Sequence, residues 1–147
     1  MDLYKYLQSS TKSLFRFEAL QDYKVEGDGI DDESMREWWS FIKEKISAGV
    51  TMQRVRLVTE PLTEYTKNEL LIHKKSKEYG DDIRIIKEET FKSLNIKMED
   101  FWLIDENIVL KMNYSELGGY SGFDVLDANI NEYIKTKNTL IENSFML

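Results

Sequence analysis

Three arginines are the residues whose spacing most clearly suggests binding chemistry. Arg54 and Arg56 alternate in the segment RVRLV, and Arg84 lies in DIRII further along the chain. Residues two apart in a strand project from the same face, so Arg54 and Arg56 are expected side by side. The planar guanidinium group matches carboxylate and phosphate oxygens. The three arginines therefore predict either a small-anion site or an ion-pair network with Asp and Glu.

Other residue types that support catalysis do not form a recognisable set. The chain has no cysteine, which excludes thiol catalysis, disulfides and thiolate metal sites. His73 is its single histidine, and its place beside Lys74 and Lys75 favours a solvated or packing role. The sequence contains neither a G-x-S-x-G elbow nor a G-x-x-x-x-G-K-[ST] phosphate loop. We therefore expect no catalytic residues, no metal and no cofactor.

The segment EDFWLIDENIVLKMNY raises the question of a catalytic carboxylate pair. Asp100 and Asp105 flank four apolar residues, and a second apolar run follows Glu106 and Asn107. The first run is short enough for a buried strand, and the second alternates apolar with polar residues. Glu106 and Asn107 suit a tight turn. The pattern favours a β-hairpin over an active site.

Aromatic residues supply the candidate contacts with a protein partner. Two adjacent tryptophans lie in a segment with helical spacing of apolar residues, and two further aromatics lie in and after the Gly-rich segment SELGGYSG. Each is either a core residue or an anchor for another protein. The partner-binding candidates are Trp38, Trp39, Tyr120 and Phe123.

These candidates are positioned by a predicted α/β arrangement. Strands are expected near residues 54–58, 83–86, 100–104 and 108–114, and helices near 35–48, 62–79 and 124–142. The first 25 residues suggest a short helix, a break, and a second short helix or irregular segment, and residues 23–34 suggest a loop. We predict a single domain over residues 1–147, with a small mixed sheet of about four to five strands flanked by helices.

Composition limits the classes of partner. The net charge is −7, which does not suit attraction to nucleic acids or anionic membranes. No window approaches the apolar length of a membrane span, and the first residues lack a signal-peptide pattern. We expect a cytoplasmic protein without a membrane association or direct nucleic-acid binding. The oligomeric state stays open, a dimer included.

The order of the segments resembles a bacterial domain-of-unknown-function family whose members often occur with helix-turn-helix regulators. The matching segments are RVRLVTEPLTEY, DIRII and DFWLIDENIV, together with Phe15, Phe17, Glu18 and Tyr23. They cover most of residues 15–123. The resemblance implies a fold and a regulatory context but no activity, and the chain shows no helix-turn-helix of its own.

The same order resembles half of a phospholipase-D-type domain. That superfamily has an H-x-K-x-x-x-x-D motif with a nucleophilic histidine. Alignment on Asp105 places Met98 at the histidine and Asp100 at the lysine. The resemblance therefore implies a degenerate half-domain without that chemistry, in which Asp105 remains as a turn residue of the hairpin.

Three functions are consistent with these observations. The first is a non-catalytic regulatory or adaptor module that binds another protein. The second is an acidic inhibitor of a bacterial defence nuclease, encoded by a phage or plasmid as anti-CRISPR proteins are. The third is a small-anion sensor that uses Arg54, Arg56 and Arg84.

Overall fold

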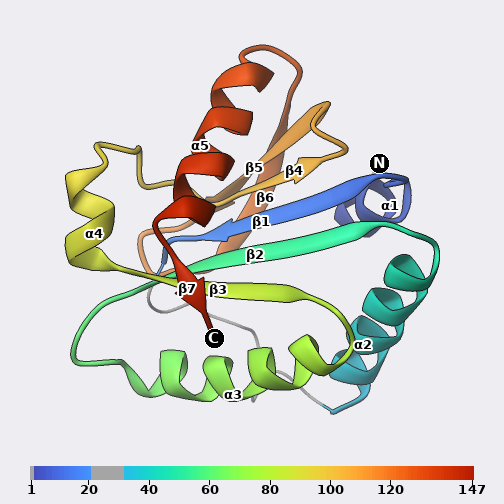
Figure 1. Ribbon diagram of the computed structural model, residues 1–147, viewed down its shortest axis with the longest axis horizontal. Coiled ribbons are helices and arrows are strands. Elements are labelled where there is room, and N and C mark those ends of the chain that lie inside the picture. The colour runs from blue at the N-terminus through green and yellow to red at the C-terminus, as the bar shows by residue number, and fades with distance from the viewer. Residues whose placement is uncertain (1, 21–31) are drawn as a thin grey trace.

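A mixed β-sheet organises the fold. The computed structural model describes residues 2–20 and 32–147, and within them seven strands form one sheet in the order β6-β5-β4-β1-β2-β3-β7 (Figure 1). β1, β2 and β3 are parallel, and the other neighbouring pairs are antiparallel. The strands are β1 (Ser13–Glu18), β2 (Thr51–Val58), β3 (Asp82–Lys87), β4 (Phe101–Ile104), β5 (Ile108–Tyr114), β6 (Tyr120–Leu126) and β7 (Phe145–Met146).

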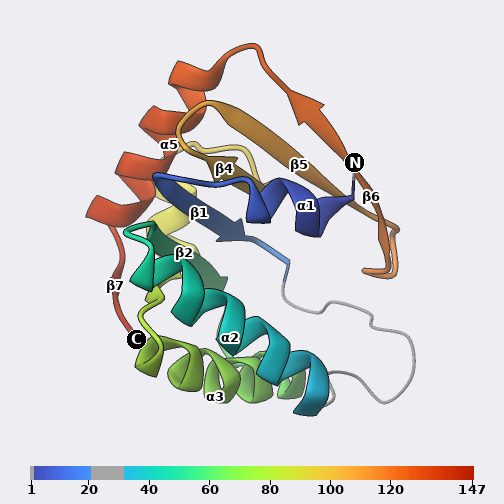
Figure 2. The same cartoon turned by 90° about the vertical axis from the view of Figure 1, so that its right-hand side faces the viewer.

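Helices cover both faces of this sheet. One face packs against α1 (Leu3–Gln8), α2 (Asp32–Ser47) and α3 (Glu64–Glu78), and we call it the α2 face. The opposite face packs against α4 (Glu88–Ser93) and α5 (Ile130–Glu142), and we call it the α5 face. Figure 2 shows α5 on one side of the sheet and α1, α2 and α3 on the other. Among the described residues, no helix is long and apolar enough to cross a bilayer.

Alternating residues of each strand divide the core into two layers. On the α5 face the layer includes Phe15, Phe17, Val55 and Leu103, against Leu140 of α5. The layer on the α2 face is built from the residues between them, with Phe41 and Ile42 of α2. Central strands buried on both faces contain near-continuous apolar runs rather than a clean alternation. This explains why β4 has the sequence FWLI.

A single carboxylate joins the β4–β5 turn to the start of β1. Asp105 accepts hydrogen bonds from the backbone N–H groups of Thr11, Lys12 and Ser13, at 2.7–3.1 Å. These three bonds lower the pKa of Asp105 although partial burial opposes them. The hairpin expected from the sequence is present, and Asp105 opens its turn with a φ of 54°. The turn spans residues 105–107, one residue more than expected.

The sheet has more strands than the four to five expected. β1 lies where we expected a helix or irregular segment, because Arg16 and Glu18 interrupt its apolar pattern. β6 takes residues 120–126, so α5 begins at Ile130 rather than near residue 124. The cis peptide bond between Glu60 and Pro61 precedes α3, which begins at Glu64. Most of the loop expected at residues 23–34 lies outside the described residues.

Candidate functional site

The α2 face contains a group of buried charged side chains on β1 and β2. Arg54 and Arg56 project from this face, as their spacing predicted. The register places Arg16 beside Arg54 and Glu18 beside Arg56. All four side chains are buried, and Arg56 is fully inaccessible to solvent. Buried charges require partners, so these residues must satisfy one another or bind groups from the covering helices.

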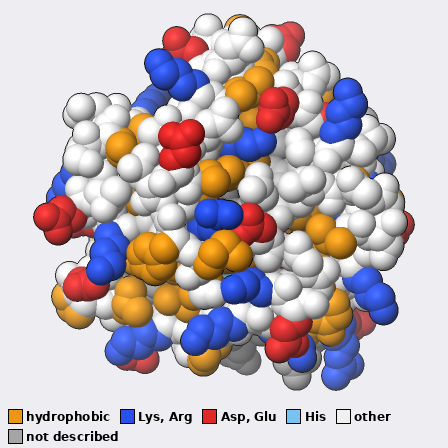
Figure 3. Space-filling view, in the orientation of Figure 1, with side chains coloured by type: hydrophobic (Ala, Val, Ile, Leu, Met, Phe, Trp, Pro, Cys, Tyr) orange, Lys and Arg blue, Asp and Glu red, His pale blue; other side chains and the backbone are white. Residues whose placement is uncertain are grey.

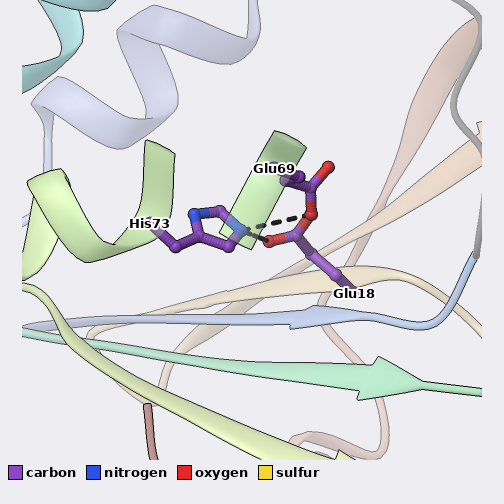
Figure 4. A group of neighbouring side chains, drawn as sticks. All are labelled: Glu18, Glu69 and His73. Atoms are coloured by element: carbon purple, nitrogen blue, oxygen red, sulfur yellow. Dashed lines mark hydrogen bonds and ion pairs between the residues drawn. The ribbon is translucent and has the colours of Figure 1, made fainter. Parts of the chain in front are cut away.

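α3 supplies two of those partners. Glu69 and His73 are four residues apart and therefore share one face of the helix. Nε2 of His73 lies 3.2 Å from Oε1 of Glu18 and 3.2 Å from Oε1 of Glu69, so the imidazole bridges two carboxylates (Figure 4). Nη1 of Arg54 donates to Oε1 of Glu18. Nε of Arg56 lies 2.9 Å from Oε1 of Glu69.

The network extends along the sheet on both sides. Nε of Arg54 lies 3.8 Å from Oδ2 of Asp81, just before β3. Nη2 of Arg16 lies 3.0 Å from Oδ2 of Asp100 and donates to the hydroxyl of Tyr114, also at 3.0 Å. Asp81 and Asp100 are both buried. The ion pairs therefore continue from Asp100, just before β4, to Asp81, just before β3.

These contacts change the acid–base properties of the central groups. Burial raises the pKa of Glu18, but the charges of Arg54 and His73 outweigh burial and hold it well below its usual value. Burial lowers the pKa of His73, but Glu18 and Glu69 outweigh it and raise the net value. Burial raises the pKa of Asp81 more than Arg54 lowers it. The geometry therefore favours an imidazolium between two carboxylates.

Glu18, Glu69 and His73 are also the described residues that could hold a metal ion, since their ligand atoms lie within 4.8 Å of one another. Two carboxylates and an imidazole are suitable ligands for a divalent cation. However, Arg54 and Arg56 contact the same carboxylate oxygens that face His73. A metal would have to displace two fixed positive charges or lie beside them. The arrangement fits an ion-pair network better than a metal centre.

This network forms one wall of a pocket with a volume of about 670 Å³. Glu18, Arg54, Glu69 and His73 line the polar wall. The remaining wall is mostly apolar and comes from α1, α2, β4 and β6, including Tyr4, Trp38, Trp102, Tyr120 and Phe123. A cavity of this size with apolar walls and a few convergent polar groups is typical of a small-molecule site.

The pocket brings together three of the four aromatic candidates. Trp38, Tyr120 and Phe123 line it, and Tyr120 is half exposed at 51%. Trp39 lies elsewhere: its ring stacks on Tyr79, and its Nε1 donates to Oγ of Ser76 at 3.1 Å. Trp38 packs against Phe41 and Trp102 instead. The two adjacent tryptophans therefore have different environments, as their angular separation on the helix allows.

The three candidate arginines lie on opposite faces of the sheet. Arg54 and Arg56 converge, but Arg84 pairs with Val55 in the β2–β3 register. Paired residues project to the same side of a sheet, so Arg84 lies on the α5 face with Val55. Its guanidinium contacts Asp82 at 3.3 Å. The expected site of three arginines does not form, because the β2–β3 register pairs Arg84 with Val55 and not with Arg54 or Arg56.

Sequence reasoning missed several residues of this site. Glu18 and Trp102 were given no role in a site, and the sequence favoured a solvated or packing role for His73. The spacing of Glu69 and His73 on a predicted helix was the available signal, because acid and histidine four residues apart share a face. Their contact with Glu18 depends on sheet register, which spacing does not reveal. The other members missed were Arg16, Asp81 and Asp100.

The positions aligned with the phospholipase-D motif do not form a site. Met98 is 55% exposed in the segment before β4. Asp100 is buried and accepts a hydrogen bond from the backbone N–H of Ala19 at 2.9 Å, in addition to its ion pair with Arg16. Asp105 caps the start of β1. Each acid has a structural partner, and the three side chains have separate surroundings.

Comparison with known proteins agrees with this architecture. The chain is similar in fold to a phospholipase D family member, Nuc from Salmonella typhimurium, with a TM-score of 0.60 and 9% identity. The match covers 97% of this chain and 86% of that chain. Identity at this level shows the fold alone. The comparison with curated proteins finds no match. A family model described as Domain of unknown function (DUF6879) matches residues 1–146, and the chain therefore belongs to that family.

Proposed function

We propose that this protein is a non-catalytic sensor or regulatory module that binds a small organic molecule in the pocket on the α2 face. The observation that carries the proposal is the pocket itself. An apolar cavity of about 670 Å³ ends at four buried charged residues from three different elements, Glu18, Arg54, Glu69 and His73. Such sites are largely formed before the ligand binds.

The electrostatics of the network support binding rather than acid–base catalysis. A general base must be unprotonated near the working pH, whereas the pKa of His73 is raised by its two carboxylates. Glu18 has a lowered pKa, because Arg54 and His73 stabilise its charge against the effect of burial, and is therefore a weak base. These groups are also held by one another. They can orient a ligand without exchanging a proton with it.

A protein partner is the second candidate. Trp38, Tyr120 and Phe123 were expected to anchor another protein, and all three lie at the pocket. A partner that inserts an apolar side chain would use the same cavity. The expected context beside helix-turn-helix regulators fits either form of binding, since a regulatory module responds to a ligand or to a protein.

The acidic-inhibitor alternative has less support from the surface. An inhibitor of a nucleic-acid channel would present clustered acids. On the face seen in Figure 3, red acidic and blue basic side chains are interspersed with hydrophobic ones. This face has no field of a single sign, and mixed surfaces of this kind are usual for soluble domains.

The test of the proposal uses the tryptophans as built-in reporters. Of the three, Trp38 and Trp102 line the pocket and Trp39 does not. We would screen soluble aromatic and alicyclic compounds against the ¹⁵N-labelled protein. Compounds that bind in the pocket are expected to shift the indole N–H signals of Trp38 and Trp102 more than that of Trp39, which reaches the pocket only through its hydrogen bond to Ser76.

A matched pair of variants locates the binding. Ile72 lines the pocket, whereas its neighbour Leu71 is 65% exposed. Ile72→Trp should fill part of the cavity and remove the thermal stabilisation by bound compounds, and Leu71→Trp should retain it. The proposal is wrong if no compound shifts the pocket tryptophans, or if Ile72→Trp binds as well as the unaltered protein.

A further inference from the structure

The imidazole of His73 has one nitrogen that the network does not use. Nε2 faces Glu18 and Glu69, and Figure 4 shows Nδ1 on the opposite edge of the ring, away from both carboxylates. Within residues 2–20 and 32–147, Nδ1 has no hydrogen-bond partner. His73 is only 8% exposed and lines the pocket. A buried imidazole nitrogen needs a hydrogen-bond partner, and beside a cavity that partner is a water molecule or a ligand atom.

The charges around this ring balance. Counted over residues 2–20 and 32–147, three arginines and a protonated His73 stand against four buried carboxylates. They come from every element that packs here: Arg16 and Glu18 on β1, Arg54 and Arg56 on β2, Glu69 and His73 on α3, Asp81 before β3 and Asp100 before β4. A ligand with a net charge at this wall would leave one buried charge without a counterpart, which is costly.

The rest of the pocket is suited to a flat or bulky apolar body. Tyr4, Trp38, Trp102, Tyr120 and Phe123 line it. The guanidinium carbon of Arg54 lies 5.5 Å from the ring centroid of Trp102 and 5.9 Å from that of Trp38. Arg54 thus already provides the positive charge that these indole rings attract. A second cation in the same place would meet Arg54 and an imidazolium, so the aromatic wall does not favour a cationic ligand.

We propose that the pocket selects an uncharged ligand that has an aromatic or alicyclic body and a hydrogen-bond acceptor such as a carbonyl oxygen, which accepts from Nδ1–H of His73. The inference rests on the proposed function, because it specifies the ligand class for the same pocket. The imidazolium is the donor, and its second N–H group stays with Glu18 and Glu69. Binding transfers no proton and leaves the charge of the network unchanged.

A set of four naphthalenes tests each part of the proposal. They share one body and differ in a single substituent: 2-acetylnaphthalene, 2-ethylnaphthalene, 2-naphthoate and 2-naphthylmethylammonium. Dissociation constants would be measured from the indole signals of Trp38 and Trp102, below pH 6.5 so that His73 is protonated. A hydrogen bond to a charged donor should make the ketone bind about tenfold more tightly than the hydrocarbon. Both charged compounds should bind more weakly than the ketone.

The histidine itself provides the second measurement. His73 is the single histidine, so the ring ¹⁵N signals need no assignment by mutation. Both nitrogens should be protonated in the free protein, and the ketone should shift Nδ1 more than Nε2. This measurement is made on the unaltered chain, so the result does not depend on whether a variant folds.

The outcomes separate the two proposals. The ligand class is wrong if the naphthoate, the ammonium or the hydrocarbon binds as tightly as the ketone, or if the ketone leaves the Nδ1 signal unchanged. If none of the four shifts the signals of Trp38 and Trp102, and the wider screen also fails, the pocket does not bind small molecules and the proposed function itself is wrong.

Discussion

His73 connects β1, β2 and α3 electrostatically. Its imidazole contacts Glu18 of β1 and Glu69 of its own helix, and each carboxylate also contacts an arginine of β2. Removing one member of such a network is costly, because it leaves another charge buried without its partner. The protonation state of His73 is therefore part of the energetics of folding.

The first prediction is that the protein loses stability as the pH rises above 6.5. The carboxylates raise the pKa of His73 above its unfolded value of 6.5, although burial opposes them. A raised pKa means that the folded state holds the proton more tightly, so the stabilisation is complete below pH 6.5 and is lost as the pH rises through the folded value. Urea unfolding at several pH values would measure this loss.

The control for this prediction is His73→Gln, which has no charge to lose. Its free energy of unfolding should be lower than that of the unaltered protein at pH 6.5 and should vary less as the pH rises. The groups that face His73 are Glu18, Glu69, Arg54 and Asp81, and all four are the same in both proteins. Equal slopes for the two proteins over this range would contradict the role given to His73.

At the scale of elements, four strands could be predicted from the sequence and three could not. The apolar runs or alternation of β2, β3, β4 and β5 identify them as strands without knowledge of the strands beside them in the sheet. Two of the three α2-face positions of β1 are charged, Arg16 and Glu18, and those charges are tolerated only because β2, α3 and Asp100 provide partners. β6 contains Gly122 and many exposed positions, which resembles a loop. The two-residue β7 is too short for a pattern.

The same difference between local sequence pattern and long-range pairing explains which residues of the site could be predicted. The neighbouring positions of Arg54 and Arg56 follow from the period of a strand, and so could be predicted. The exclusion of Arg84 and the inclusion of Glu18 both depend on register between strands. The placement of Tyr120 and Phe123 in the same pocket as Trp38 depends on the pairing of β6 with β5. Long-range geometry of this kind is not encoded in local periodicity.

The second prediction concerns the junction between α3 and β3. Gly80 has a φ of 114°, and a Cβ at this position would lie 2.8 Å from Cγ1 of Ile46 in α2. Gly49 also has a positive φ, of 90°, but a Cβ there would contact nothing within 4 Å. Gly49→Ala should cost about 1–2 kcal/mol of unfolding free energy from backbone strain alone. Gly80→Ala should cost about 1–3 kcal/mol more, because a close contact is added to the strain.

Urea denaturation of the two variants, side by side with the unaltered protein, would measure this difference. The two glycines end neighbouring helices and precede neighbouring parallel strands, so each is a matched control for the other. If Gly80→Ala were no more destabilising than Gly49→Ala, Ile46 would have room to move, and the packing of α2 on this junction would be looser than the distances indicate.

At the scale of the whole molecule, the sheet has a protected centre and two different edges. β1 lies between β2 and β4 and is buried on both faces, and most residues of β2 are buried too. β6 forms one edge and has no fully buried residue, and the two residues of β7 at the other edge are exposed. The charged network and the inner wall of the pocket are built on the central strands, whereas Tyr120 and Phe123 come from an edge strand.

The third prediction is a gradient of backbone protection across this sheet. Amide hydrogens in β1, β2 and β4 should exchange slowest, at rates set by global unfolding, because their hydrogen bonds break only when both core layers open. Those in β6 and β7 should exchange faster by local opening, since each edge strand has a neighbour on one side only. Hydrogen–deuterium exchange with peptide resolution would measure the order of exchange rates.

If β6 were as protected as β1, the prediction would be contradicted, and another chain would have to cover this edge. Sedimentation at several protein concentrations would reveal such an association. A pocket ligand should slow exchange in β6 more than in β7, because only β6 contributes residues to the pocket wall.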